Sequence, residues 1–296
     1  MSVLVFGSAA ADIVFALPSL PRAGETILGD AAPLQPGGKG ANQALAAARD
    51  GAHVAFAGAI GADAAGEVVR APLLAAGVDC SRLAVVDRPT GLAAVCVDPA
   101  GANLIAVATG ANARAAAAQV EDSALHPGVV LLLQMEVPAA ETAALILRAR
   151  AQGARIILNL APAAPLDPAA LRALDLLVVN EHEAAWLGAQ LGAGASAEAL
   201  HAALGIGVAV TLGERGATAA TAAGVVTLPG LPVLAVDTVG AGDCWCGVLA
   251  AALDRGLSLE AAMRRANAAA ALACTRPGAG AAMPQAAEID ALLRKG

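Results

Sequence analysis

Short apolar runs alternate along the chain with longer stretches in which apolar residues recur at helical spacing. The short runs predict interior strands, because each is bounded by polar residues or glycine. The longer stretches predict helices at 40–49, 138–151 and 197–204, and Asp167 followed by Pro168 is typical of a capped helix start. The predicted strands are 3–6, 54–57, 129–133, 155–158, 176–179 and 208–212, with a further apolar run at 233–236. Repeated strand–helix alternation indicates an α/β fold with a mainly parallel sheet covered on both faces.

Two segments interrupt this alternation. Residues 12–34 contain short apolar pieces separated by Pro18, Pro21 and Gly24. Residues 91–108 resemble a hairpin, with strands at 92–97 and 103–107 and a turn at 98–101. Together they predict a small β-sheet outside the main layers, formed by about 12–36 and 91–108, which would serve the single domain as a lid that excludes water.

Polar side chains follow the predicted strands. Because ligands of open α/β sheets bind beyond the carboxyl ends of the strands, these side chains are expected to share one edge. Each alone is typical of a helix cap or a solvated loop, but together they predict a site. They are Asp12, Glu136, Asn159, Asn180, Asp237 and Asp243.

Composition excludes several classes of protein. Aromatic residues make up 2% of the chain, tyrosine is absent and the net charge is -7. This argues against nucleic-acid binding, which needs stacking platforms or basic patches. The apolar runs are shorter than the ~18 residues of a membrane span, and the N-terminus is interpreted as a strand and not a signal peptide. Five cysteines without a CxxC pair predict free thiols in a reducing cytoplasm.

The most specific segment is 237–243, which reads Asp-Thr-Val-Gly-Ala-Gly-Asp and precedes an apolar helix. Glycine permits the turn, and the first amides of the helix have no internal acceptor, so they form an anion site. A carboxylate beside an anion site suits phosphoryl transfer. Asp243 would take a proton from a hydroxyl while the amides stabilise the transferred group. Taken alone, the segment also fits a plain helix cap after a glycine turn.

The second segment, 37–44, reads Gly-Gly-Lys-Gly-Ala-Asn-Gln-Ala. It is not a Walker A loop, because Lys39 is followed by glycine and not by Ser or Thr. Glycine lets a ligand approach the backbone, and Lys39 and Asn42 offer hydrogen-bond donors to hydroxyls. A glycine-rich helix start with a solvated lysine is the simpler interpretation of this segment alone.

With these segments in this order, the chain resembles the ribokinase (PfkB) family of carbohydrate kinases nearly from end to end. The matching segments are 7–8 with Asp12, 37–42, 58–66, 90–91, 110–112, Glu136, 159–163, 180–183, 211–216, 237–243 and 275–279. The resemblance implies a three-layer ribokinase-like fold with a β lid, through which members often form homodimers. It also implies a small-sugar substrate, ATP, Mg²⁺ and a monovalent cation, usually K⁺.

The resemblance also implies a role for each matching residue. Asp243 would be the catalytic base beside an anion hole of Gly240, Ala241 and Gly242. Sugar hydroxyls would be held by Asp12, Gly38, Lys39, Asn42 and Glu136. The ATP site would comprise Asn180, Glu183, Thr211, Gly213, Gly216 and Asn267, with Glu183 near Mg²⁺. The monovalent cation would be bound by Asp237 and the carbonyls of Val239, Ala273, Arg276 and Gly278.

Two positions depart from the family pattern. Ala10 stands where ribokinases carry asparagine, and Ala282 stands where a serine near the cation site is usual. The resemblance implies that the hydroxymethyl group of D-ribose is phosphorylated to give ribose 5-phosphate. A site that loses a hydroxyl partner loses discrimination, so Ala10 weakens this choice of sugar more than the expectation of a kinase. The alternatives are a kinase of another sugar or a nucleoside, and a non-catalytic sugar-binding protein on this scaffold. A nicotinamide dehydrogenase is disfavoured because the first strand lacks a G-x-G-x-x-G turn.

Overall fold

The computed structural model describes residues 2–29, 32–99 and 103–294. Its main sheet has the strand order β13-β12-β11-β10-β9-β8-β1-β4-β5, parallel except for antiparallel β12 and β13 at one edge. The strands are β1 (Ser2–Phe6), β4 (Val54–Gly61), β5 (Asp79–Val86), β8 (Val129–Leu133), β9 (Arg155–Asn159), β10 (Leu176–Asn180), β11 (Gly207–Thr211), β12 (Ala217–Thr221) and β13 (Gly224–Leu228). The six interior strands expected from the short apolar runs are therefore confirmed.

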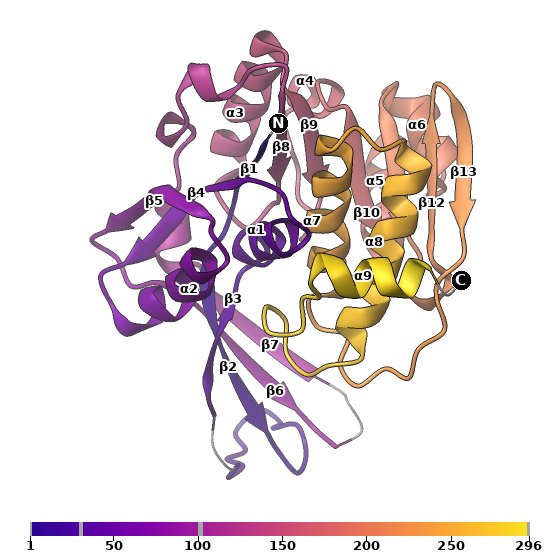
Figure 1. Ribbon diagram of the computed structural model, residues 1–296. Coiled ribbons are helices and arrows are strands. Elements are labelled where there is room, and N and C mark those ends of the chain that lie inside the picture. The colour runs from indigo at the N-terminus through magenta and orange to yellow at the C-terminus, as the bar shows by residue number, and fades with distance from the viewer. Residues whose placement is uncertain (1, 30–31, 100–102, 295–296) are drawn as a thin grey trace.

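Helices cover both faces of this sheet (Figure 1). On β8, Val130 and Leu132 face one apolar cluster while Leu131 and Leu133 face the other, as the alternation of side chains along a strand requires. The first face carries α1 (Lys39–Arg49), α2 (Ala64–Ala75), α7 (Ala241–Asp254), α8 (Leu259–Cys274) and α9 (Ala286–Leu293). The second face carries α3 (Ala139–Gln152), α4 (Pro168–Arg172), α5 (Glu181–Leu191) and α6 (Ala197–Leu204). The predicted three-layer α/β arrangement is confirmed.

Close packing of α1 against α7 positions the site. A Cβ atom on Gly247 of α7 would lie 2.4 Å from the carbonyl oxygen of Gln43 on α1, so this crossing requires glycine. Nearly all of α7 is buried, and its alanines let neighbouring helices approach closely. The starts of the two helices, at Lys39 and Ala241, therefore meet at one edge of the sheet.

A separate four-stranded sheet projects from the body, with the order β3-β2-β6-β7 (Figure 1). Its strands are β2 (Ala10–Ala16), β3 (Leu34–Gly37), β6 (Gly91–Val97) and β7 (Asn103–Ala108). Antiparallel pairing of β6 with β7 confirms the predicted hairpin strands. Residues 30–31 of the predicted lid, and residues 100–102 with part of its predicted turn, lie outside the described residues.

Two sequence-based expectations were wrong. Residues 233–236 form no strand, and Leu234 is 88% exposed. The chain leaves the sheet at Pro229 and meets Pro232, and neither proline can donate a hydrogen bond to a sheet. Asp12 comes after β1 along the chain, but it does not lie at the edge of the main sheet with the other polar side chains; it lies within β2, paired with Gln35 of the small sheet.

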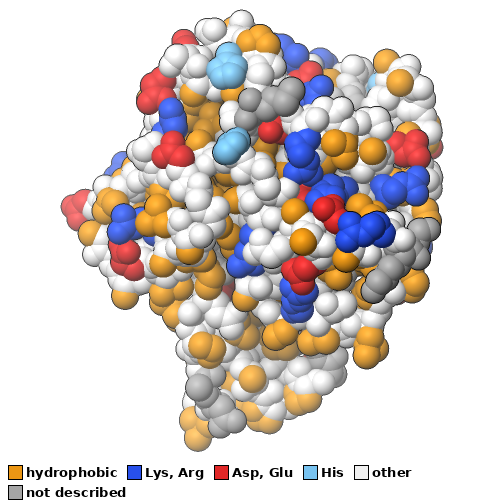
Figure 2. All heavy atoms as spheres, viewed as in Figure 1, with side chains coloured by type: hydrophobic (Ala, Val, Ile, Leu, Met, Phe, Trp, Pro, Cys, Tyr) orange, Lys and Arg blue, Asp and Glu red, His pale blue; other side chains and the backbone are white. Residues whose placement is uncertain are grey.

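Charged side chains are spread over the body, whereas the projecting sheet shows mainly apolar and uncharged atoms on the face in Figure 2. Among the described residues, every helix is too short or too polar to cross a bilayer.

Candidate active site

The turn before α7 has the backbone that an anion site needs. Gly240 caps the helix with a φ of 77°, a left-handed conformation that favours glycine. Ala241 donates its amide to the carbonyl of Thr238 at 3.2 Å, so this predicted anion-hole donor is already paired. Gly242 lies in the first turn, where amides have no acceptor within the helix, and its Cα faces open space. The amide of Gly242 is therefore the better donor to a bound anion.

Asp243 follows in the same turn, buried and held by α1. The amide nitrogen of Asn42 donates to Oδ2 of Asp243 at 3.0 Å, and the amide nitrogen of Gln43 donates to Oδ1 at 3.0 Å. Each carboxylate oxygen thus has one fixed donor and at least one lone pair free for a further hydrogen bond. Asp243 is 7% exposed, so it reaches solvent only through the adjoining cavity.

That cavity has a volume of about 110 Å³ and brings together most of the residues predicted around the phosphates. It lies at the carboxyl ends of β9, β10 and β11, where ligands of such sheets bind. Predicted residues in its wall are Lys39, Asn159, Asn180, Glu183, Thr211, Gly240, Gly242 and Asp243, joined by Ala161, Val178 and Cys246.

The electrostatics of the cavity favour a charged lysine. The carboxylate of Asp243, followed by those of Glu136 and Glu183, raises the pKa of Lys39 against the opposing effect of its own burial. Burial raises the pKa of Glu183. Burial also raises the pKa of the Cys246 thiol, so it stays protonated and neutral beside Asp243. Lys39 therefore presents positive charge in a wall whose acidic side chains are Glu183 and Asp243.

The predicted sugar residues come from β2 of the small sheet, the start of α1, which lines the cavity with Lys39, and the segment after β8. Glu136 accepts hydrogen bonds from the Ser8 hydroxyl at 2.6 Å and from the Lys39 amide at 3.0 Å. Gly38 has a φ of 87°, and a Cβ there would lie 2.7 Å from the amide of Ala10. The side chain of Asp12 covers Gly37, where a Cβ would lie 2.3 Å from Oδ2. Burial, then the charges of Glu136 and Asp243, raise the pKa of Asp12 to about 6.

Some predicted nucleotide residues have other partners. Asn180 and Glu183 form a complete capping box at the start of α5, with bonds of 2.8 and 2.9 Å. The side chain of Asn267 accepts from Trp245 at 2.8 Å and donates to the Pro229 carbonyl at 3.1 Å, so its polar atoms are used within the protein. Asn267 and the two loop glycines, Gly213 and Gly216, are absent from the cavity wall.

The predicted cation residues come from two segments that the structure brings together. Asp237 accepts from the amides of Val239 and Gly278, both at 2.9 Å, which ties the turn before α7 to the loop after α8. The carbonyl of Ala273 accepts from the amide of Arg276 at 3.2 Å. Over residues 2–29, 32–99 and 103–294, no three His, Cys, Asp or Glu side chains cluster as metal ligands. One carboxylate with backbone carbonyls suits a monovalent ion, so these residues fit such a site.

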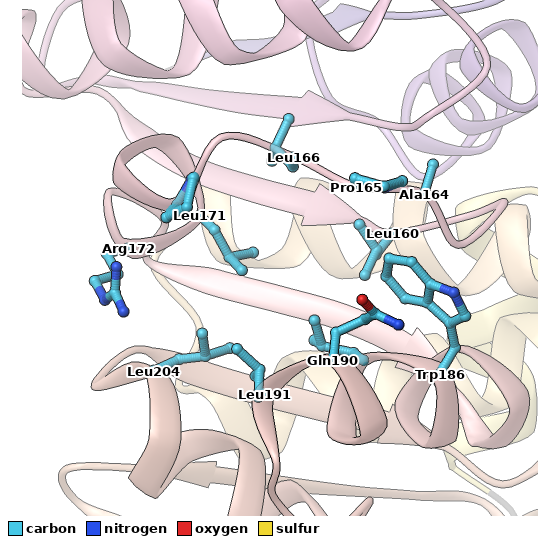
Figure 3. A pocket seen from close by; sticks show the side chains of 12 residues that line it. Leu160, Ala164, Pro165, Leu166, Leu171, Arg172, Trp186, Gln190, Leu191 and Leu204 are labelled. Carbon is cyan, nitrogen blue, oxygen red and sulfur yellow. The ribbon is translucent and has the colours of Figure 1, made fainter.

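A larger cavity, of about 190 Å³, lies elsewhere, against α4, α5 and α6 (Figure 3). Its wall is mainly apolar, with the ring of Trp186 beside Leu160 and the side-chain amide of Gln190 next to them. It contains no carboxylate or histidine that could act as an acid or base, so the smaller cavity is the candidate active site.

Three buried residues of the site were missed from the sequence. Ser8 binds Glu136, Gln43 binds Asp243, and Gln134 binds Gln43 at 2.6 Å. Gln43 directly follows Asn42 in the glycine-rich segment, and Gln134 comes one residue after a predicted strand. Their positions next to a predicted motif and a predicted strand were the only sequence features that could have pointed to Gln43 and Gln134 as site residues.

Comparison with known proteins gives one consistent result. The chain is 36% identical to a ribokinase of Bacillus subtilis over 99% of both chains, and 35% identical to one of Haemophilus influenzae over 96% and 95%. A ribokinase structure from Thermotoga maritima superimposes with a TM-score of 0.92 at 32% identity, covering 99% of both chains. An Arabidopsis thaliana ribokinase complexed with ribose and ATP gives 0.88 at 31% identity, covering 99% and 98%. The model of the pfkB family of carbohydrate kinases matches residues 1–286, and the chain belongs to that family.

Proposed function

We propose that this carbohydrate kinase transfers the terminal phosphoryl group of ATP to the hydroxymethyl group of D-ribose, giving ribose 5-phosphate and ADP. The observation that carries the proposal is the shared cavity. Asp243, the turn at Gly240 and Gly242, and Lys39 all line it, although Lys39 comes from a distant part of the chain. The ribokinase names of the relatives, and the ribose and ATP in the Arabidopsis complex, support the choice of substrates.

In the proposed reaction, Asp12, Glu136 and Asn42 hold the sugar beneath the small sheet, which acts as a lid. Asp243 accepts the proton of the sugar hydroxyl. The hydroxyl oxygen forms a bond to the γ-phosphorus of ATP as the bond from that phosphorus to the bridging β-phosphate oxygen breaks, which releases ADP. The amide of Gly242, the start of α7 and the ammonium of Lys39 stabilise the charge that develops. The protein's contribution is mainly positioning and charge stabilisation.

Two metal ions are part of the proposal. Mg²⁺ would neutralise phosphate charge, and Glu183 is the wall residue suited to its surroundings, because Mg²⁺ is usually held by one or two carboxylates together with substrate phosphates. K⁺ would be held by Asp237 and by the carbonyls of Val239, Ala273, Arg276 and Gly278, where it would strengthen the positive field at the anion hole. Asn180 and Thr211, with Gly213, Gly216 and Asn267 further out, complete the proposed ATP site.

An ADP-release assay over pentoses, 2-deoxyribose, hexoses and nucleosides, with and without K⁺, tests this function. We expect the highest kcat/KM with D-ribose and stimulation by K⁺. A second candidate, a kinase of another sugar or a nucleoside, is favoured by Ala10, which offers no side-chain amide to a hydroxyl. A higher kcat/KM for such a substrate would establish that alternative. Absence of ADP release with all of them would favour a sugar-binding protein instead.

Sugar affinity is expected to fall in mild acid, because ionised Asp12 is the better acceptor for sugar hydroxyls. With a pKa of about 6, roughly a tenth of Asp12 stays ionised at pH 5, so KM for the sugar should rise up to about tenfold from pH 7 to pH 5. Unfolding does not account for this, because a raised carboxyl pKa contributes stability that is present at low pH and lost as pH rises through 6. The measurement is KM against pH for the wild type and for Asp12→Asn. Asp12→Asn should have a high KM for the sugar that changes little with pH. If its KM rose between pH 7 and pH 5 as much as that of the wild type, the assignment of Asp12 would be contradicted.

We further propose that two copies associate through the small sheet. Leu104 and Val107 of β7, and Leu28 in the segment between β2 and β3, are 47%, 62% and 87% exposed, so this part of the molecule presents large apolar side chains to solvent. We expect light scattering to give the mass of a dimer, and Val107→Lys to shift it towards the monomer. Val225→Lys is the matched control, because Val225 is 52% exposed on β13, in the other sheet. A dimer that both variants leave intact would contradict this interface.

The cysteines also support a cytoplasmic location. All five are free thiols, as expected in a reducing compartment.

A further inference from the structure

A chain of side-chain amides leads from the interior of the protein to Asp243. Gln134, which is fully buried just beyond β8, donates from Nε2 to Oε1 of Gln43 at 2.6 Å. Gln43, also fully buried, donates from Nε2 to Oδ1 of Asp243 at 3.0 Å and to Oδ1 of Asn159 at 3.1 Å. The end of β8 and the helices α1 and α7 are thereby linked by one path of side-chain hydrogen bonds.

The hydrogen bonds fix the direction of every amide in this path. Asn159 donates from Nδ2 to the carbonyl of Val178 at 3.3 Å, so its Oδ1 is an acceptor. The carboxylate of Asp243 is also an acceptor, and Gln43 must therefore turn its NH₂ group towards both. The Oε1 of Gln43 then faces Gln134, so Gln134 has to turn its NH₂ group towards it as the donor. If Gln134 rotated by half a turn, two amide oxygens would face each other.

The orientation of the Gln134 amide leaves one buried oxygen without a hydrogen-bond partner in the part of the chain that the structure describes. With the amide of Gln134 turned to donate, its Oε1 has no hydrogen-bond partner among the described residues. The oxygen lies against Gly7, where an added Cβ would be only 1.8 Å away. Buried polar atoms without partners are rare in native proteins and call for an explanation. Holding Gln43 in one orientation supplies that explanation.

We propose that Gln134 is a positioning residue for phosphoryl transfer, which locks the amide of Gln43 and thereby the carboxylate of Asp243. The inference rests on the proposed role of Asp243 as the base. The second donor to Asp243, Asn42, is also expected to bind a sugar hydroxyl, so it is free to change partners when the sugar arrives. Gln43 has no such second duty, because its three contacts all lie within the protein. Gln43 therefore keeps the base aligned, and Gln134 keeps Gln43 aligned.

The test is a double-mutant cycle on kcat with Gln134→Met, Gln43→Met and the pair. We expect Gln134→Met to lower kcat about tenfold, because small misalignments of reacting groups slow transfer strongly. KM for ribose and for ATP should stay within about twofold. Because Gln134 acts through Gln43, the double variant should have the kcat of Gln43→Met alone. Additive losses, or an unchanged kcat in Gln134→Met, would overturn the proposal.

A matched control separates positioning from general stability. Gln119, unlike Gln134, is only partly buried, and its Nε2 donates to the carbonyls of Gly58 and Arg82 at 2.7 and 2.8 Å, away from the site. Gln119→Met should lower Tm while leaving kcat unchanged. If it lowers kcat as much as Gln134→Met does, the effect of Gln134 is merely structural and the proposal fails.

A second measurement needs no substitution at the buried path. In ¹⁵N-glutamine-labelled wild-type protein, the side-chain NH₂ of Gln43 should exchange with solvent slowly and give one fixed pair of NMR signals. Fast exchange or rotation would overturn the proposal even if Gln134→Met fails to fold. Loss of turnover in Asp243→Asn with normal turnover in Gln134→Met would reject only this inference. Retained turnover in Asp243→Asn would reject the proposed base itself.

Discussion

Replacing Asp243 with asparagine is expected to lower kcat about 10³-fold while leaving the affinity for the sugar nearly unchanged. A general base contributes about 10²–10⁴-fold to a rate, and an amide cannot take the hydroxyl proton. Most of the proposed sugar contacts, at Asp12, Glu136 and Lys39, remain in the variant. The measurement combines kcat from ADP release with calorimetric titration of the sugar.

Asparagine at 243 has one local consequence that must be separated from the loss of the base. Asn42 and Gln43 both donate to the carboxylate, so the new NH₂ group will face one of these donors. Asp254→Asn is the matched control, because Asp254 is a buried carboxylate at the opposite end of the same helix. It should keep kcat within about twofold. Turnover of Asp243→Asn within tenfold of the wild type would contradict the assignment of the base.

The layered fold could be predicted from the sequence because its strands are buried on both faces. Such strands appear as uninterrupted apolar runs, and the segment Val129–Leu133 is one of them. The edge strands β5 and β13 were missed, because they mix exposed with buried positions. Their neighbour β12 was missed because its sequence, Ala-Thr-Ala-Ala-Thr, gives no uninterrupted apolar run. The apolar run at 233–236 misled for the opposite reason. Apolarity without partner strands, and with prolines on its N-terminal side, does not make a strand.

The site was predictable where residues are close in sequence and not where they meet only in space. The turn at Gly240 and the carboxylate of Asp243 lie together in one motif, and the structure places both in the wall of one cavity. Gln134 is 91 residues from its partner Gln43, and no local pattern announces that contact. The position of Asn267 shows the converse, because a family role does not reveal that Trp245 and Pro229 already occupy the amide.

Replacing Asp50 with asparagine is expected to destabilise the fold by about 3–5 kcal/mol, the usual cost of leaving a buried charge without its partner. The carboxylate of Asp50 follows α1 and is fully buried. It accepts hydrogen bonds from Arg255 at 2.6 Å and from Arg265 at 2.5 Å, and Arg265 also binds Asp290 of α9. The variant leaves Arg265, whose side chain is 11% exposed, facing an amide in place of a carboxylate. Urea denaturation of both proteins measures the difference.

An exposed ion pair on α8, the helix that carries Arg265, is the matched control for the buried ion pairs of Asp50. Glu260 and Arg264 form an ion pair in α8 at 3.1 Å, but their side chains are 55% and 60% exposed. Because water screens such a pair, Glu260→Gln should change the free energy of unfolding by less than about 1 kcal/mol. A loss in Asp50→Asn no larger than this would show that the two arginines find other partners. The larger loss would mean that this one carboxylate holds α1, α8 and α9 in register, and with them the start of α1 that carries Lys39 and Asn42.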